Sequence, residues 1–377
     1  MANQFSETTT TGYGSRIINS IKGIVFGFIL FIASFGVLYW NEGRVDVSSI
    51  AKTAIDISTS KSAPSDANGK LVSVSGVVTS DEKLGDDLFL KPGDYLAVSR
   101  VSEMYAWIEK SESKSEKNLG GSETTTTTYS YSQGWTSSPS STSSFKEPAG
   151  HENPVKTIED AQKTVGSSRI STYDLDLSKM GLPNYEKLLL TKDNTDLTKQ
   201  GVLAGEYVYV GKGNSQTPQL GDMRISYTAL KKNSQGTVFG KLDGQKISTY
   251  VDEKTNESLY RMFNGTRDES LKQMHSEYTM WLWIMRAVGF VMMWIGLASL
   301  FGPISVLLDV VPFFGSLSGA VIGLVTFVVA LVLSVVTIFA AMILHSLVAT
   351  IIAVVVAVAI VMFIIKVKGK KPNVVKA

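Results

Sequence analysis

Residues 23–41 read GIVFGFILFIASFGVLYWN, a run of 19 residues without a charged side chain. About 20 apolar residues in a helix cross the hydrocarbon core of a bilayer. Tyr39 and Trp40 lie at the end of the run, where aromatic side chains favour the membrane interface. The run therefore predicts a transmembrane helix. A cleaved signal peptide is disfavoured, because the run is too long and no small-residue cleavage site follows it.

A second apolar segment, residues 280–301, is interrupted by Arg286. A charge inside a span costs a few kcal/mol on insertion scales. Two interpretations remain open at this point. The Arg286 side chain can extend to the headgroups along its apolar stem, or it can form an ion pair with Glu42 or Glu277 that joins two spans. Asp309 follows this segment and is expected near the cytoplasmic face.

Residues 310–365 contain no Asp, Glu, Lys or Arg. One helix of that length would be about 84 Å long, at about 1.5 Å per residue, which is nearly three bilayers. We therefore expect two spans with a tight turn between Ala341 and Ser346, where the His345 ring can reach water. These spans are 317–340 and 347–365. The apolar segment before them, 302–316, is predicted to lie in the interface.

The ends of the chain predict the orientation. The tail, residues 366–377, has five lysines, and the N-terminal tail, residues 1–22, has Arg16 and Lys22. Because basic segments stay in the cytoplasm, we expect both tails there and residues 42–279 on the other side. The predicted fold class is a multi-pass α-helical membrane protein with four spans, and with a large β-rich α+β extracytoplasmic domain between spans 1 and 2.

The extracytoplasmic domain shows the alternation and the β-branched residues typical of strands. Two of its runs, 95–108 and 124–135, are expected to pair as a long hairpin across a charged, Gly-ended connection. Other strands are expected at 71–79, 206–211, 223–229, 237–242 and 246–251, with a two-residue turn at Asp243-Gly244. Residues 255–279 have roughly helical spacing and predict an amphipathic helix that continues into the second span.

The composition excludes several kinds of chemistry. The chain has no cysteine, so disulfides, thiolate metal sites and cysteine nucleophiles are excluded. A net charge of +2 gives no field that would attract nucleic acid. No phosphate-binding loop, G-x-S-x-G or H-E-x-x-H motif occurs. We therefore expect no catalytic, cofactor-binding or metal-binding residues, and we interpret the pair Asp86-Asp87 as solvated surface.

Small residues recur at every fourth position in the apolar segments, as at Gly23 and Gly27. This spacing lets membrane helices approach closely, within one chain or between copies. We expect three groups of residues to make structural contacts or interactions: the residues at the end of the first span, the charged or titratable residues of the apolar segments, and glycines with this spacing. These candidates are Asn41, Glu42, Gly43, Arg44, Arg286, Asp309, His345, Gly315, Gly319 and Gly323.

Seven ordered motifs resemble the transmembrane protein 43 family, also called LUMA. They are Asn41-Glu42-Gly43-Arg44; Asn68-Gly-Lys-Leu-Val with Gly76; Arg100 with Glu103-Met104-Tyr105 and Trp107-Ile-Glu109; Thr128-Tyr-Ser-Tyr131 with Trp135 and His151-Glu-Asn-Pro154; Gly221-Asp-Met-Arg224-Ile-Ser-Tyr227; Trp283, Arg286, Gly289, Met293 and Gly296-Leu297; and Leu308-Asp309-Val-Val-Pro312-Phe. The resemblance departs in the Ser/Thr-rich loop at 136–144, and the last two expected spans match mainly in hydrophobicity.

The resemblance implies four spans and a non-enzymatic organiser of membrane complexes, placed in animals at the endoplasmic reticulum and the inner nuclear membrane. We expect a membrane scaffold that needs no cofactor, binds no nucleic acid and contacts the lipid bilayer, copies of itself and other membrane proteins. An ion channel or transport subunit is the alternative, and an accessory subunit of a membrane enzyme or envelope-stress system is another. The lack of cysteine favours a bacterial plasma membrane.

Overall fold

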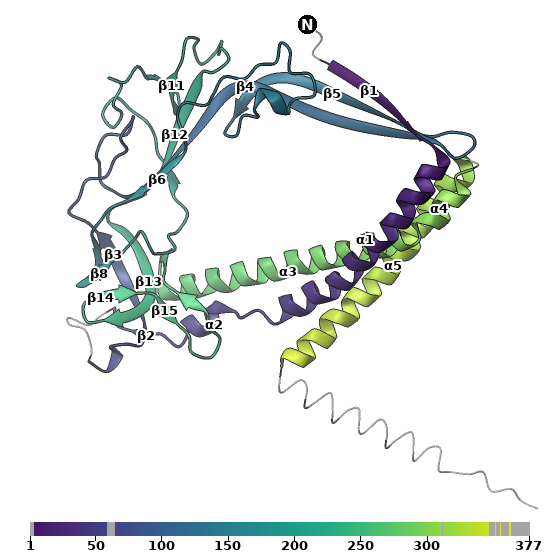
Figure 1. The fold of residues 1–377 in the computed structure, drawn as a ribbon. Helices are drawn as coiled ribbons and strands as arrows, with labels where there is room; N and C mark the ends of the chain where they lie inside the picture. The colour runs from purple at the N-terminus through teal and green to yellow at the C-terminus, as the bar shows by residue number, and fades with distance from the viewer. Residues whose placement is uncertain are drawn as a thin grey trace, which may run out of the picture. The chain divides into compact units, whose positions relative to one another are not determined.

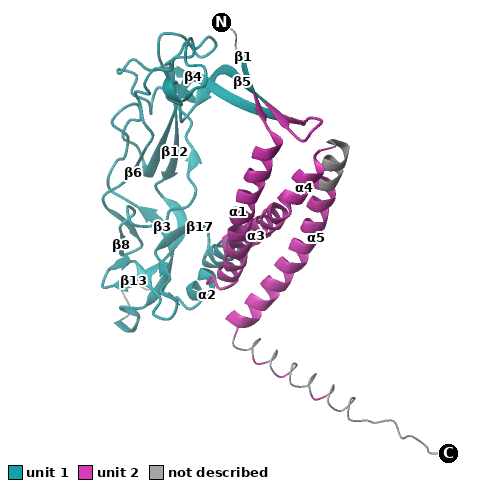
Figure 2. Ribbon diagram, turned by 45° about the vertical axis from the view of Figure 1, so that its right-hand side comes forward, with its two compact units in different colours: residues 1–8, 46–114, 126–276 teal, residues 9–45, 115–125, 277–377 magenta. Residues whose placement is uncertain are grey.

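The computed structural model describes residues 4–58, 65–310 and 312–346, together with Ile351, Val355 and Met362 (Figure 1). The chain forms two compact units, coloured separately in Figure 2. We call residues 1–8, 46–114 and 126–276 the β-rich unit, and residues 9–45, 115–125 and 277–377 the helical unit. Neither unit is one continuous piece of chain.

An eight-stranded sheet has the order β1-β5-β4-β12-β11-β10, and β6 and β9 pair with β4 and β12 beside this path. Its strands are β1 (Gln4–Thr11), β4 (Tyr95–Lys117), β5 (Glu123–Thr136), β6 (Ala161–Thr164), β9 (Glu186–Lys187), β10 (Val202–Ala204), β11 (Tyr207–Val210) and β12 (Met223–Lys231). The long hairpin of β4 and β5 confirms the predicted pairing. Its strands run further than predicted, because alternating Ser, Glu and Lys continue β4 to Lys117.

A second sheet has seven strands in the order β17-β13-β14-β8-β7-β3-β2. Strand β13 also pairs with β3, so the path from β13 through β14, β8 and β7 to β3 closes into a small barrel. The strands are β2 (Ile55–Asp56), β3 (Leu71–Thr79), β7 (Ser168–Ile170), β8 (Tyr173–Leu175), β13 (Ser234–Asp243), β14 (Lys246–Ser248) and β17 (Arg261–Asn264), and β15 (Tyr250–Val251) pairs separately with β16 (Ser258–Leu259).

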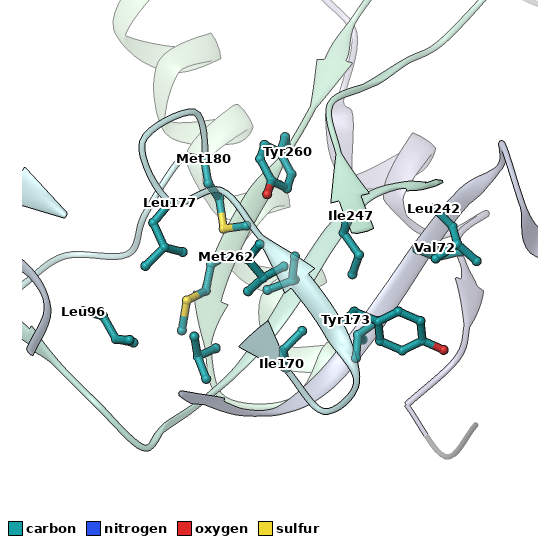
Figure 3. Close-up of a cluster of buried hydrophobic side chains, with 14 of the residues drawn as sticks. Val72, Leu96, Ile170, Tyr173, Leu177, Met180, Leu242, Ile247, Tyr260 and Met262 are labelled. Carbon is teal, nitrogen blue, oxygen red and sulfur yellow. The ribbon is translucent and has the colours of Figure 1, made fainter. Parts of the chain in front are cut away.

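The core of the β-rich unit consists of two clusters of buried apolar side chains. One cluster fills the small barrel, where Ile170, Tyr173 and Leu242 have no exposed surface (Figure 3). The other cluster lies on the eight-stranded sheet and includes Met104, Ile225 and Tyr227. Burying each such side chain contributes about 1.5–3 kcal/mol, so these clusters hold the unit together without disulfides.

Two local predictions for this unit are wrong. The pairing of Asp243 with Lys246 makes Gly244 and Gln245 the turn residues, rather than Asp243 and Gly244. Residues 255–279 are not one helix, because β16 and β17 occupy 258–264. Leu259, Tyr260, Met262 and Phe263 are all buried there, and Gly265, with φ +88°, lies between β17 and the helix that begins at Arg267.

The helices are α1 (Tyr13–Glu42), α2 (Val47–Ala51), α3 (Arg267–Leu300), α4 (Gly302–Leu308) and α5 (Pro312–His345). Three stretches of the described chain are long and apolar enough to cross a membrane, and they lie within residues 13–51, 267–300 and 319–345. The predicted interfacial segment 302–316 is divided between α4 and the first turn of α5.

The predicted four-span fold class is wrong, because three candidate membrane helices are found among the described residues. The predicted third span, 317–340, is part of α5, which runs without interruption to His345. Ala, Met, Ile and Leu at 341–344 continue the helix, so the chain has no reason to turn at Ala341. The predicted fourth span, 347–365, and the tail lie outside the described residues, apart from three isolated positions.

Asp86 is buried inside the β-rich unit, which corrects its interpretation as solvated surface. Its carboxylate accepts hydrogen bonds from three backbone N–H groups, from the Arg100 guanidinium at 2.5 Å and from the Tyr227 hydroxyl at 2.6 Å. Burial raises the pKa of Asp86, but these bonds outweigh burial and hold the pKa below its usual value. Asp87, by contrast, is 86% exposed.

We expect Asp86→Asn to destabilise the β-rich unit by about 3 kcal/mol, because Arg100 loses a buried partner. Since the folded pKa lies below the unfolded one, the stability that Asp86 contributes is present above the unfolded value, about 3.9, and is lost as the pH falls through the folded pKa. Denaturant titration at several pH values measures this loss. Asp87→Asn is the control, with an expected change within about 0.5 kcal/mol. Equal effects of the two substitutions would contradict the role of Asp86.

Candidate functional site: buried charges of the helical unit

Helices α1 and α3 approach each other closely at glycines. A Cβ atom on Gly27 would lie 2.6 Å from the Cβ of Ser299, and one on Gly296 would lie 2.7 Å from the backbone nitrogen of Phe31. No larger residue fits at these positions without moving the backbone. The small-residue spacing in the sequence includes Gly27, whereas its partner Gly296 belongs to one of the family motifs.

Glu42 ends α1 and forms an ion pair with Arg286 of α3. The guanidinium Nε and Nη2 each lie 2.8 Å from one carboxylate oxygen, so the contact is a two-pronged fork. The Glu42 side chain is 3% exposed and Arg286 is 14% exposed. Paired, charge-assisted hydrogen bonds of this kind are the strongest that side chains make. The structure therefore places Arg286 against Glu42, the first of the two partners considered.

The residues around this pair include other predicted candidates. Asn41 is buried and donates from Nδ2 to the carbonyl oxygen of Leu282 at 3.0 Å. The Nε2 atom of His345 lies 3.1 Å from the carbonyl oxygen of Tyr39. Gly43 packs so closely on the His345 ring that a Cβ there would lie 2.5 Å from it. These contacts join the end of α1 to both α3 and α5.

Arg44 is less firmly held than Arg286. Its guanidinium carbon lies 5.8 Å from the centre of the Trp40 ring, and its carbonyl oxygen accepts a hydrogen bond of 3.4 Å from Tyr278. An exposed contact of a cation with a ring contributes about 0.5–1 kcal/mol. Arg44 therefore serves as a control for the paired Arg286.

A second cluster surrounds Asp309, between α4 and α5. Its carboxylate, 1% exposed, forms ion pairs with Arg16 of α1 and with Lys117 at the end of β4, and the Lys117 distance is 2.7 Å. Arg16 also lies 3.0 Å from Glu123 and donates to the carbonyl oxygen of Gly121 at 2.6 Å. Two cations and two carboxylates are thus packed together, which joins the hairpin turn to α1 and to the α4–α5 connection.

The sequence predicts other roles for these residues. Arg16 indicates a positively charged N-terminal tail that stays in the cytoplasm, and Lys117 lies in the charged connection of the predicted hairpin. The predicted topology places Asp309 and Lys117 on opposite sides of the membrane. Because the Lys117 and Asp309 side chains form an ion pair, the two residues lie on the same side of the membrane. The Thr10 hydroxyl lies 3.3 Å from the Thr124 hydroxyl, which also places the N-terminal strand β1 beside the hairpin.

We expect Thr10 and Leu119 to face the same side of the membrane. Because the chain has no cysteine, Thr10→Cys and Leu119→Cys give single thiols at exposed positions, and Leu119 is 84% exposed. A maleimide that cannot cross membranes should label both variants when it is added to one side of sealed vesicles. Labelling of one variant alone would contradict the contacts between β1, the hairpin turn and Asp309.

The three candidate glycines of α5 do not act alike. Gly315 lies in the first turns of α5. A Cβ on Gly319 would lie 3.4 Å from the hydroxyl of Ser305 in α4, an ordinary contact. A Cβ on Gly323 would meet no atom within 4 Å. The carbonyl oxygen of Gly323 accepts a hydrogen bond of 3.0 Å from Trp294. The close approach of α1 and α3 at Gly27 and Gly296 is therefore tighter than the contacts described for Gly319 and Gly323.

The arrangement of both clusters suits structural attachment. In each of them a buried carboxylate faces a cation of another element, and removal of either partner would leave a charge without compensation. Within the described ranges of the chain, no group of three or more His, Asp or Glu side chains is placed to hold a metal ion.

Comparison with known proteins agrees with the motifs. The family model "Transmembrane protein 43" matches residues 104–365, which is more than half of the chain. The chain belongs to this family. The resemblance inferred from the sequence is confirmed, and several residues that carried it, among them Glu42, Arg286 and Asp309, are the residues of the two clusters.

Relatives from animals match most of the chain. Transmembrane protein 43 of Homo sapiens is 25% identical over 327 residues, which cover 81% of this chain and 80% of the relative. The protein of Rattus norvegicus is 24% identical over the same coverage. The homolog of Drosophila melanogaster is 26% identical and covers 72% of this chain and 74% of its own. No solved structure matches. The chain is thus a membrane protein of the transmembrane protein 43 family.

Proposed function

We propose that the chain is a non-enzymatic membrane scaffold that associates with itself and organises complexes of other membrane proteins. The observation that carries this proposal is that the buried charges of the helical unit are paired with one another. Arg286 is paired with Glu42, and Asp309 with Arg16 and Lys117. These ion pairs hold the end of α1 against α3, and hold the start of α1 and the hairpin turn against Asp309. They stabilise one conformation of the helical unit, on which partners can assemble.

The same positions weigh against a channel or transport subunit. Arg286 and His345 contact the end of α1, at Glu42 and Tyr39, whereas Asp309 contacts Arg16 near its start. The distance along α1 from residue 16 to residue 42 is about 39 Å. Polar groups at the two ends, with an apolar helix between them, do not line one path for ions.

Native mass spectrometry of the full chain in lipid nanodiscs tests the proposal. We expect masses of two or more chains, at multiples of the 40.9 kDa of one chain. Affinity capture from the source membrane in mild detergent should also retain other membrane proteins. Monomers at every protein concentration, together with capture of the chain alone, would contradict the scaffold.

We further propose that the purified chain has no hydrolase, transferase or redox activity of its own. An activity that follows the chain through purification, and is lost on one substitution, would overturn this proposal.

We also propose a plasma-membrane location with the β-rich unit outside the cytoplasm, based on the lysine-rich tail and on the lack of cysteine. Val155 is 86% exposed, so Val155→Cys should react with an impermeant maleimide on intact cells. Reaction only after the cells are opened would contradict this side.

A further inference from the structure

A groove of about 570 Å³ lies within the β-rich unit, on one face of the eight-stranded sheet. Pockets of roughly 300–1,000 Å³ are the usual size for small ligands. Eleven residues line this groove, and none of them is charged. They are Ser99, Gln162, Thr164, Leu177, Ser178, Met180, Leu182, Pro183, Asn184, Tyr185 and Thr228.

The floor of the groove is a row of polar side chains on three neighbouring strands. Strand β4 pairs with β6 so that Ser99 is opposite Gln162, and with β12 so that Ser99 is opposite Thr228. Directly opposite residues point to the same face of a sheet. Thr164 is two residues after Gln162 and shares that face. The pairing register, and not a loop, therefore fixes these groups side by side.

The wall of the groove is the segment between β8 and β9. It contributes the apolar side chains of Leu182 and Pro183 and the ring of Tyr185. The Tyr185 hydroxyl accepts a hydrogen bond of 2.5 Å from the Gln162 amide, which holds the ring beside the floor. Burial raises the pKa of Tyr185, so the hydroxyl stays protonated and can still donate.

The floor retains free hydrogen-bonding capacity. Within the described chain, the hydroxyls of Ser99, Thr164 and Thr228 make no side-chain hydrogen bond to another residue, although all three are half-buried. Each hydroxyl can donate one bond and accept two, and the Gln162 and Asn184 amides add donors and acceptors. The groove thus offers closely spaced, uncharged hydrogen-bonding groups beside an aromatic ring.

We propose that this groove binds a neutral carbohydrate. A sugar presents hydroxyls that both donate and accept, which match the floor, and C–H faces that match the Tyr185 ring and the apolar wall. A charged ligand would find no opposite charge among the lining residues. A peptide strand would need free backbone groups, whereas β4 and β12 use theirs in pairing with each other. The inference is independent of the proposed scaffold function.

Calorimetry and saturation-transfer NMR on the full chain in nanodiscs test the proposal. Nanodiscs are needed because sugar-headed detergents would compete for the groove. The probes are maltohexaose, cellohexaose and chitohexaose, with an uncharged Gly-Ser peptide of similar size. We expect saturable binding of at least one oligosaccharide and none of the peptide.

The double variant Ser99→Ala/Thr228→Val removes two floor hydroxyls with almost no change of shape. It should raise the Kd for the bound oligosaccharide about tenfold or more, the effect of losing one or two hydrogen bonds. The matched control is Ser113→Ala/Thr127→Val, which removes another hydroxyl pair, 2.9 Å apart, in the β4–β5 hairpin. Its Kd should be unchanged.

Three results would overturn the proposal. They are no binding of any of the three oligosaccharides, equal loss of affinity in the floor variant and the control, and preferential binding of the peptide. A floor variant that loses affinity while its unfolding midpoint and circular dichroism match the parent chain would support it, because misfolding is then excluded as the cause.

Discussion

Asp309→Asn is expected to cause the largest loss of stability in the helical unit, about 3–5 kcal/mol. The substitution keeps the shape of the side chain but removes its charge. Arg16 and Lys117 then lose their common partner, and Arg16 is only 8% exposed, so water cannot replace the carboxylate. Unfolding in nanodiscs, followed by the fluorescence of the membrane tryptophans, measures the loss.

Asp268→Asn is the matched control for this prediction, since Asp268 is an exposed carboxylate in the first turn of α3. It should change the stability by less than about 0.5 kcal/mol. Lys117→Gln added to Asp309→Asn should recover part of the loss, because one unpaired charge is removed with its partner. A loss of the same size in Asp268→Asn, or none in Asp309→Asn, would contradict the Asp309 cluster.

Arg286→Ala is expected to destabilise the helical unit by about 3 kcal/mol, since Glu42 would be left buried without a partner. Arg286→Lys should be intermediate, because lysine keeps the charge but cannot make the two-pronged contact with Glu42. The same unfolding experiment measures both variants.

Arg44→Ala is the control, with an expected loss below about 1 kcal/mol, because the Arg44 side chain contacts the Trp40 ring rather than a buried carboxylate. If Arg286 merely reached toward the headgroups, lysine would serve as well as arginine. Equal stability of Arg286→Lys and the parent chain would therefore contradict the fork.

Local signals in the sequence predicted much of this fold. The uncharged run at 23–41 lies within α1, and the alternation at 71–79 is strand β3. The Arg286–Glu42 pair was also within reach, because a costly charge in an apolar segment needs a partner at a similar depth. In each of these cases the information lies within one segment or at the ends of two neighbouring spans.

The Asp309 cluster could not be predicted in the same way. Its members Arg16, Lys117 and Glu123 are far from Asp309 in sequence, and each has an ordinary interpretation as a surface charge. The four-span prediction failed for a related reason. An apolar run with no breaker shows only that the chain is helical and lipid-soluble, and it does not mark where one helix ends.

A double-mutant cycle between positions 42 and 286 tests most directly that buried ion pairs fix the helical unit. The free energy of unfolding is measured for the parent chain, Glu42→Gln, Arg286→Ala and the double variant, in nanodiscs of one lipid composition. The account predicts a coupling energy of about 1.5–3 kcal/mol, because each single variant leaves a buried charge that the double variant does not. A coupling energy indistinguishable from zero would contradict it.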